Sequence, residues 1–163
     1  MKSYYKLIDS IFGYLNGNES INTVTTGDIF EVDLSKHTIF PLAHIIVNEV
    51  AFEEHFMNFS LTILAMDVVD ETKSDKQSTS SPHLGMDNKQ DILNTMLSVI
   101  NGLQSSLRRG GLESDGFELN ESASATLFED RMESLFTGWS LTLNVQVANN
   151  DIQIINSTGT GCL

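Results

Sequence analysis

The sequence predicts an α+β fold in which an antiparallel sheet of hairpins packs on one face against two main helices. Apolar side chains occupy every second position of residues 137–147, which is the pattern of a half-buried strand. Residues 4–15 and 92–107 instead carry apolar side chains at spacings of three and four, as an amphipathic helix does. The chain has 163 residues, of which 40% are hydrophobic, and this suits a single core. We expect one domain over residues 1–150, then an edge strand and tail at 151–163.

The first helix is expected at residues 4–15, and Gly17 is a plausible stop. Its apolar face consists of Tyr4, Leu7, Ile8, Ile11, Phe12 and Leu15. A short strand candidate follows at residues 21–25. Residues 29–34 alternate only partly, and Phe40-Pro41 ends the element before it.

A hairpin is expected from residues 43–50 and 56–69. Both segments are rich in β-branched and aromatic residues, and an acidic turn at 52–54 separates them. In the second arm the apolar residues of positions 57–63 share one face. Beyond Ile63 both faces become apolar, so the pattern predicts cover on both, by the domain's helices and by a neighbouring molecule.

Residues 70–88 form a polar stretch with no apolar anchor before Leu84. A structureless insertion of this length is uncommon in a compact domain unless it has a role. Two interpretations have equal weight here. The stretch is either an arm that embraces an adjacent subunit or a simply disordered loop.

The second helix is expected to begin at the N-cap candidates Asp87 and Asn88 and to end at Gly110-Gly111. Arg108 and Arg109 near its C-terminal end suit the helix dipole. Its apolar stripe consists of Ile92, Met96, Val99, Ile100, Leu103 and Leu107, widened by Leu93 and Leu97. Such a stripe is typical of packing on a sheet.

The last part of the domain is expected to be a short strand at residues 117–119, a polar bend at 120–122, and a closing hairpin. In that hairpin the charged run 128–136 leads into the strand at 137–147. The sequence places the corner between the two strands at Thr137-Gly138.

The net charge of −13 comes from 9 basic and 22 acidic residues. Binding that neutralises nucleic-acid phosphates needs clustered Lys and Arg, so the charge argues against it. An acidic wall along which DNA slides without sticking is compatible, although charge alone favours simple solubility. Cys162 is the single cysteine, so an intramolecular disulfide is excluded. No run reaches the roughly 18 apolar residues of a membrane span, and we expect a soluble, unsecreted protein.

No constellation of catalytic residues stands out. The four histidines are scattered, none at the i, i+4 spacing of a helical metal pair, and no nucleophile elbow or phosphate-binding loop is present. We therefore expect no enzymatic activity, no cofactor and no metal site. An enzyme with an acidic metal site at Asp67, Asp70 and Glu71 is kept as an alternative. It is a minor one, because neighbouring residues on a strand point to opposite faces and their carboxylates therefore do not converge.

Three groups of segments carry a resemblance to a known family. They are residues 23–30 with 38–44, residues 90–95, and residues 128–131 with 137–139. Together they resemble the tail-terminator or tail-completion proteins of tailed bacteriophages, in particular the ring proteins in the neck and tail of crAss-like phages. The resemblance implies a structural subunit that forms a closed ring around the DNA channel of the virion.

The resemblance also implies partners and a location. The partners would be further copies in a ring of six or twelve and the adjacent portal, ring or tail-tube proteins, with no membrane. Genomic DNA would pass through the lumen without specific binding. The protein would lie in the neck or tail of the virion after assembly in the host cytoplasm. The alternative from another class is a monomeric or dimeric adaptor that binds a partner protein through an exposed sheet edge.

Two long connections, residues 29–41 and 70–88, are the expected sites of contact between subunits or between rings. The candidate residues are Ile29, Phe30, Phe40, Pro41, Lys73, Lys76, Pro82 and Leu84. For Ile29, Phe30 and Phe40, ordinary burial in the core has equal weight.

Overall fold

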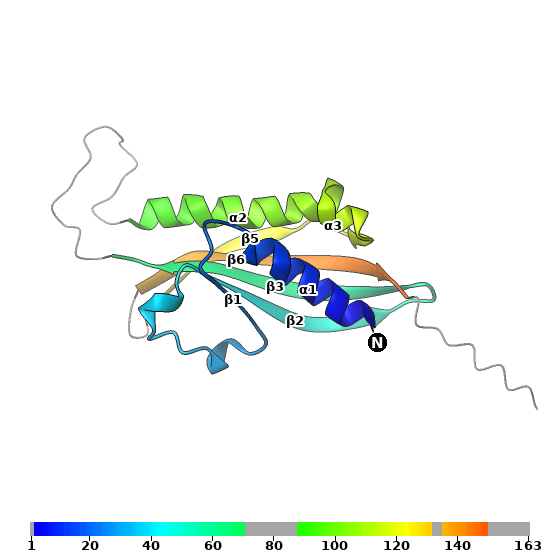
Figure 1. The fold of residues 1–163 in the computed structure, drawn as a ribbon, viewed down its shortest axis with the longest axis horizontal. Coiled ribbons are helices and arrows are strands. Elements are labelled where there is room, and N and C mark those ends of the chain that lie inside the picture. Colours follow the sequence, from blue (N-terminus) through cyan, green and yellow to red (C-terminus); the bar gives the residue numbers. More distant parts are fainter. Residues whose placement is uncertain (1, 71–87, 132–134, 150–163) are drawn as a thin grey trace, which may run out of the picture.

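A six-stranded sheet with two main helices on one face forms the molecule, as Figure 1 shows in a computed structural model that describes residues 2–70, 88–131 and 135–149. The helices are α1 (Lys2–Asn16) and α2 (Lys89–Arg109), and the short α3 (Gly111–Ser114) follows α2. The predicted α+β class, with helices packed on a sheet of hairpins, is confirmed.

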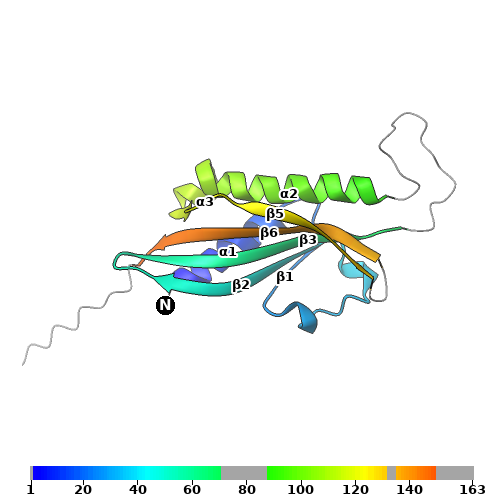
Figure 2. The same ribbon diagram turned by 180° about the vertical axis from the view of Figure 1, so that it is seen from behind.

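The central strands of the sheet are β2 (Leu42–Phe52), β3 (Phe56–Val68) and β6 (Leu135–Ala148). β1 (Thr23–Thr26) flanks β2, while β4 (Phe117–Leu119) and β5 (Ser124–Arg131) both pair with β6. β5 pairs with residues 135–142 of β6 and β4 with residues 145–147, so the two strands share one edge. Figure 2 shows β5 beside β6.

The sheet departs from the predicted antiparallel arrangement at one edge, because β1 and β2 are parallel. A parallel pair needs a crossover of a dozen or more residues, and residues 27–41 supply it. The crossover contains two 3₁₀ turns, η1 (Ile29–Glu31) and η2 (His37–Ile39). The first of them lies where the sequence showed partial alternation, at residues 29–34.

Both predicted hairpins are present, but the corner of the second was wrong. Phe52 pairs with Met57 in the first hairpin, and Arg131 pairs with Leu135 in the second. Thr137 and Gly138 therefore lie inside β6 and not at a turn. Glycine is needed at position 138 because a Cβ there would lie 2.0 Å from the carbonyl oxygen of Ala65 on β3.

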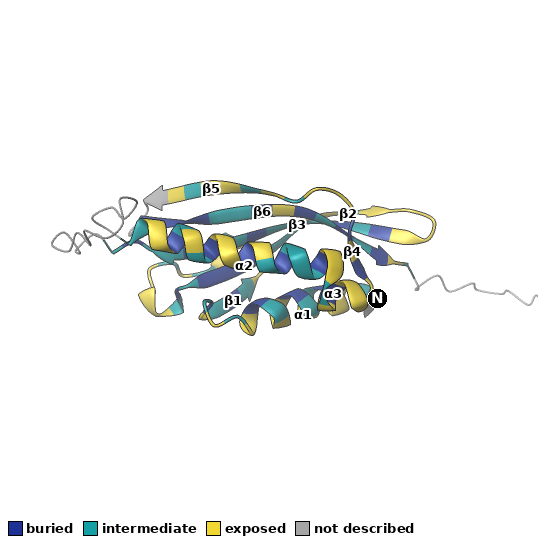
Figure 3. Ribbon diagram, turned by 90° about the horizontal axis from the view of Figure 1, so that it is seen from above, coloured by how far each residue is buried: buried dark blue, intermediate teal, exposed yellow. Residues whose placement is uncertain are grey.

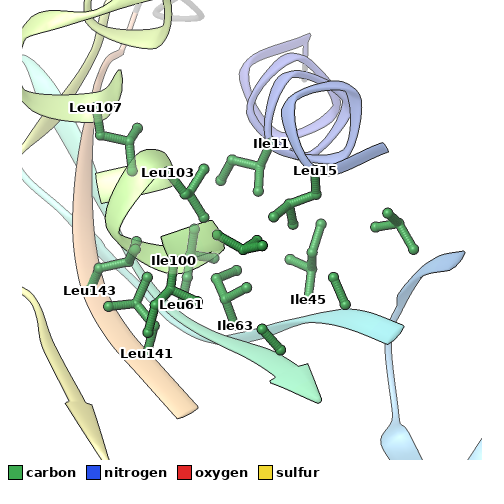
Figure 4. Close-up of a cluster of buried hydrophobic side chains, with 14 of the residues drawn as sticks. Ile11, Leu15, Ile45, Leu61, Ile63, Ile100, Leu103, Leu107, Leu141 and Leu143 are labelled. Atoms are coloured by element: carbon green, nitrogen blue, oxygen red, sulfur yellow. The ribbon is translucent and has the colours of Figure 1, made fainter. Parts of the chain in front are cut away.

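The main core lies between the two helices and the sheet, as Figure 4 shows. α1 contributes Leu7, Ile11 and Leu15, all fully buried, which confirms the centre of the predicted apolar face. Tyr4 and Phe12, which were predicted on the same face, are 38% and 37% exposed. The predicted stripe of α2 is also buried, and Figure 3 shows buried positions alternating with exposed ones along this helix. Leu97 does not widen that stripe, because it is 43% exposed on the outer side.

The far end of β3 is covered on both faces, as the sequence predicted. Ala65 belongs to the core beneath the helices, whereas Met66 belongs to a second cluster on the opposite face. The second cover comes from the chain itself, since η1, η2 and the residues around them lie there (Figure 1).

Two predicted segments fall largely outside the described residues. They are the loop or arm at 70–88, of which Asp70 and Asn88 are described, and the edge strand and tail at 151–163. Asn88 precedes α2 as predicted, but its side chain makes no capping hydrogen bond. Its Oδ1 instead accepts a hydrogen bond of 2.8 Å from the backbone N–H of Asp70.

Candidate functional site

The crossover between β1 and β2 is shaped by short polar contacts. Gly27 begins it with a φ of 106°, a left-handed conformation that favours glycine. Asp28 then caps η1, because its Oδ1 accepts a hydrogen bond of 2.9 Å from the N–H of Phe30. Asp33 accepts bonds from the N–H and the hydroxyl of Ser35, at 3.2 and 2.6 Å. These local bonds stabilise turns where no strand partner is available.

A buried histidine ties the start of the crossover to β2. His44 is fully buried, and its Nδ1 lies 2.7 Å from the hydroxyl oxygen of Thr25. Its Nε2 lies 3.1 Å from the carbonyl oxygen of Gly27. A carbonyl can only accept, so Nε2 carries the proton and Nδ1 accepts from Thr25. Burial lowers the pKa of His44, against smaller opposing effects of the Gly27 carbonyl and the Asp28 carboxylate.

The end of the crossover packs under the sheet. Phe40 stacks on Phe136 of β6 with ring centroids 5.1 Å apart, and the two rings form a second cluster with Leu42 and Met66. The peptide bond between Phe40 and Pro41 is cis. The crossover is thus fixed at both ends, by His44 and by Phe40.

Between these fixed ends the crossover and the sheet form an apolar cavity that is open to solvent on one side. Its volume is about 730 Å³, which lies within the range of 300–1,000 Å³ usual for binding pockets. Most of the wall is apolar, with Asp33, Ser35 and Ser140 as its polar members. The apolar lining residues are Ile29, Phe30, Val32, Leu34, Leu64, Met66, Phe128 and Phe136.

Phe30 is the most exposed large apolar side chain at this cavity. It is 86% exposed, although it contributes to the lining. An aromatic ring held at the mouth of an apolar cavity is typical of a surface that binds another molecule. We treat this cavity, with Phe30 at its mouth, as the candidate functional site.

The residues predicted as interface candidates have different places in the structure. Ile29 and Phe30 line the cavity, whereas Phe40 is only 8% exposed and belongs to the core. Pro41 lines a second cavity of about 400 Å³ near the start of α2. The other four candidates, Lys73, Lys76, Pro82 and Leu84, lie outside the described residues.

Val32 and Leu34 lie within the segment 29–41 that was predicted to make contacts, whereas four apolar lining residues were not predicted as part of a site, namely Leu64, Met66, Phe128 and Phe136. One signal pointed to them, the apolar character of both faces of β3 beyond Ile63. The sequence gives no indication that residues from the crossover, β3, β5 and β6 meet at one place.

The second cavity contains the acidic side chains of Glu19, Asp67 and Asp91. Burial raises the pKa of Asp67, against a smaller opposing effect of the hydrogen bond from the N–H of Val68. Within residues 2–70, 88–131 and 135–149, no group of three or more His, Cys, Asp or Glu side chains could hold a metal ion. The alternative metal site predicted from the sequence includes Glu71, which lies outside the described residues.

None of the helices in the described part of the chain is both long enough and apolar enough to cross a membrane. No known family model matches the sequence, and no curated protein matches it either.

Proposed function

We propose that this chain is a structural, non-enzymatic subunit that assembles with further copies of itself into a closed ring in the neck or tail of a tailed bacteriophage. The proposal begins from the resemblance of several segments to tail-terminator and tail-completion proteins. Its neighbours would be portal, ring or tail-tube proteins, and it would reach the virion after assembly in the host cytoplasm.

The observation that supports assembly best is the apolar cavity with Phe30 at its mouth. A single chain leaves this aromatic ring 86% exposed and the cavity without an occupant from the described residues. Exposed apolar surface of this kind marks interaction sites in proteins that are stable alone. Burying Phe30 against a second chain would remove its ring from water, and aromatic anchors of this type dominate binding energies.

The position of the site favours a ring over a symmetric dimer. The cavity lies at one end of the sheet, below the crossover, and the helices cover the other face. If the surface that fills the cavity comes from elsewhere on the next subunit, the contact is heterologous, and repeated heterologous contacts form a ring when the rotation between subunits closes. The net charge of −13 would keep DNA from adhering to a channel wall.

The test is the mass of the purified protein in solution by light scattering, followed by class averages of negatively stained particles. We expect closed rings of six or twelve copies of the 18.0 kDa chain. The variant Phe30→Asp should shift the mass towards the monomer, because a charge cannot be buried at the cavity mouth without a partner. A mass of one chain at every concentration would contradict the ring proposal.

The second candidate function is an adaptor that binds a partner protein through a sheet edge. It is favoured by the edge of β2, because β1 pairs only with residues 42–45 of this strand. The outer edge of residues 46–52 has no strand partner among the described elements. An extended peptide could add to that edge as a further strand. A monomer or dimer in the light-scattering experiment would favour this adaptor function.

A further inference from the structure

We propose that the apolar cavity binds residues 150–163 of a neighbouring copy of this chain, with Ile152, Ile154 and Ile155 as the side chains that enter it. The inference depends on the proposed ring and deepens it, because it names the contact that joins one subunit to the next. Four observations support it: the chemistry of the cavity, the place where the described chain ends, the reach of the remaining residues, and the charges around the cavity mouth.

The cavity requires an apolar occupant larger than a single side chain. Its volume is about 730 Å³, and its wall is formed mainly by aliphatic and aromatic side chains. Each buried isoleucine side chain contributes about 1.5–3 kcal/mol when it leaves water. Several such side chains on one segment would fill the cavity and cover Phe30.

The described chain ends at the opposite end of the sheet. The backbone N–H of Asn149 donates a hydrogen bond of 2.8 Å to the carbonyl oxygen of His55, beside the turn between β2 and β3. The cavity lies near the other end of β3, at Leu64 and Met66. Nine residues of strand separate His55 from Leu64, which corresponds to about 30 Å. Figure 2 shows β6 ending beside this turn, away from the crossover.

The isoleucines cannot cross that distance within their own chain. Ile155 is six residues beyond Asn149, and six fully extended residues span at most about 21 Å. The residues after Ile155 are Asn, Ser, Thr and Gly until Cys162, so they offer no other apolar anchor before the last two positions. The isoleucines can therefore fill only the cavity of another copy.

The charges near the cavity also favour this segment. Asp28, Glu31 and Asp33 lie in or beside η1, and Lys36 forms an ion pair of 3.5 Å with Asp33. Asp151 is the one charged side chain of the proposed segment and precedes the isoleucines, while residues 152–163 carry no acidic or basic side chain that this acidic surface would repel.

The competing occupant from a second copy is the turn between β2 and β3. It presents Phe52 and Phe56, which are 70% and 41% exposed. The same turn carries Glu53 and Glu54, which would meet the acidic residues around η1. Like charges at close range oppose that contact, whereas no charged side chain lies among the isoleucines.

The first experiment uses the full-length chain with Ile152→Asn and Ile154→Asn together. We expect light scattering to show loss of the oligomer, with an unchanged circular dichroism spectrum. The matched control is Gln153→Ala with Asn156→Ala, which leaves the isoleucines in place and should assemble as the unchanged chain does. Assembly by the isoleucine variant at the level of the control would overturn the inference.

The second experiment measures the contact directly. A fluorescently labelled peptide of residues 150–163 is titrated with the full-length isoleucine variant, and binding is followed by anisotropy. We expect saturable binding that Phe30→Ala in the protein, or the two asparagine substitutions in the peptide, weakens at least tenfold. Absence of saturable binding, or equal binding of both peptides, would overturn the inference. Binding of a small apolar dye in the cavity that the peptide does not displace would also overturn it.

These outcomes separate the inference from the proposed function. If the unchanged chain forms rings that persist in the isoleucine variant, the ring stands and this contact is wrong. If the unchanged chain is a monomer at every concentration and the peptide does not bind, both are wrong.

Discussion

At the scale of single residues, His44 fixes the start of the crossover that forms one wall of the candidate site. It is fully buried, and both of its ring nitrogens are used, one by Thr25 and one by the Gly27 carbonyl that begins the crossover. Protonation of Nδ1 would turn the acceptor of the Thr25 hydroxyl into a second donor and bury a charge. The neutral form of His44 therefore stabilises both β1 and the crossover above the cavity.

We expect the protein to lose stability as the pH falls below the ordinary histidine pKa of 6.5. Burial lowers the pKa of His44 in the folded state, so between 6.5 and that lower pKa the unfolded chain binds more protons. The free energy of unfolding therefore decreases as the pH falls through this window. Urea unfolding at a series of pH values from 7.5 to about 5 measures this decrease in the free energy of unfolding. The range is chosen because it spans the ordinary pKa of histidine.

The histidine experiment needs two variants. His44→Gln should flatten the pH dependence in this window, because no imidazole remains at the buried position. His55→Gln is the control, since the His55 side chain is 73% exposed on the turn between β2 and β3. If His44→Gln and the unchanged protein lose stability equally over the window, His44 is not the group responsible.

A second residue-scale prediction concerns Gly138. A Cβ at this position would lie 2.0 Å from the Ala65 carbonyl oxygen and 2.8 Å from the Met66 Cα, and both are backbone atoms that cannot rotate away. We expect Gly138→Ala to lower the free energy of unfolding by about 3 kcal/mol, at the upper end of the cost of overpacking. Urea unfolding would measure this change.

The matched control for that substitution is Gly13→Ala in α1. Nothing lies within 4 Å of a Cβ at Gly13, which is exposed in the middle of the helix. Alanine there should raise the free energy of unfolding by about 0.5–1 kcal/mol, because it lowers the backbone entropy of the unfolded chain. Similar effects of the two substitutions would mean that the close approach of β3 and β6 is not what requires glycine.

At the scale of elements, the packing of α2 on the sheet depends on one face of the helix. Leu103 is fully buried in the main core, whereas Leu97 is 43% exposed on the outer side of the same helix. The indole N–H of Trp139 on β6 also donates a hydrogen bond of 2.8 Å to the Leu93 carbonyl of α2. Since the chain has a single tryptophan, its fluorescence reports the contact between α2 and β6.

We expect Leu103→Ala to cost about 2–5 kcal/mol, the range for truncating a buried leucine. Leu97→Ala should change the free energy of unfolding by less than about 0.5 kcal/mol, because Leu97 lies on the outer side of the helix with 43% of its surface already in water. Chemical unfolding followed by Trp139 fluorescence measures both. A large loss in Leu97→Ala would show that the outer side of α2 is covered in solution, which is itself a sign of assembly.

The elements that repeat a simple period were predicted from the sequence, and those governed by long-range contacts were not. α1, α2 and the β2–β3 hairpin follow from spacings that local burial imposes. Glycine at position 138 is required by the backbone of β3, which is distant in sequence. Because that contact cannot be seen in the sequence, Gly138 was interpreted as part of a turn. The crossover has no period because η1 and the turn after it are stabilised by local hydrogen bonds to the side chains of Asp28 and Asp33.

The same distinction explains what was predicted of the candidate site. Ile29 and Phe30 were singled out because they lie in a long connection, and both line the cavity. Phe128 and Phe136 belong to a hairpin roughly a hundred residues later. They reach the cavity only because β6 pairs with β3, with Val68 opposite Phe136. Sequence spacing carries no information on such pairing.

At the scale of the whole molecule, the proposed ring needs contacts that a single chain does not use for its own fold. The residues 71–87 are a natural place for one, because the chain leaves and re-enters the described structure at almost the same point. The Asp70 N–H and the Asn88 Oδ1 are 2.8 Å apart. Closing this connection with a short linker therefore requires no movement of β3 or α2.

We expect replacement of residues 73–82 by two glycines to leave the free energy of unfolding nearly unchanged and to weaken assembly. Shortening a loop whose ends already meet changes the closure entropy by about 1 kcal/mol or less, while any contact made by Lys73, Lys76 or Pro82 with a neighbour is lost. The control keeps the length and replaces the same residues with glycine and serine, which separates loss of reach from loss of side chains. Urea unfolding and light scattering on all three proteins decide the matter. Rings that form equally well in each would show that the connection takes no part in assembly, and would leave the cavity as the contact between subunits.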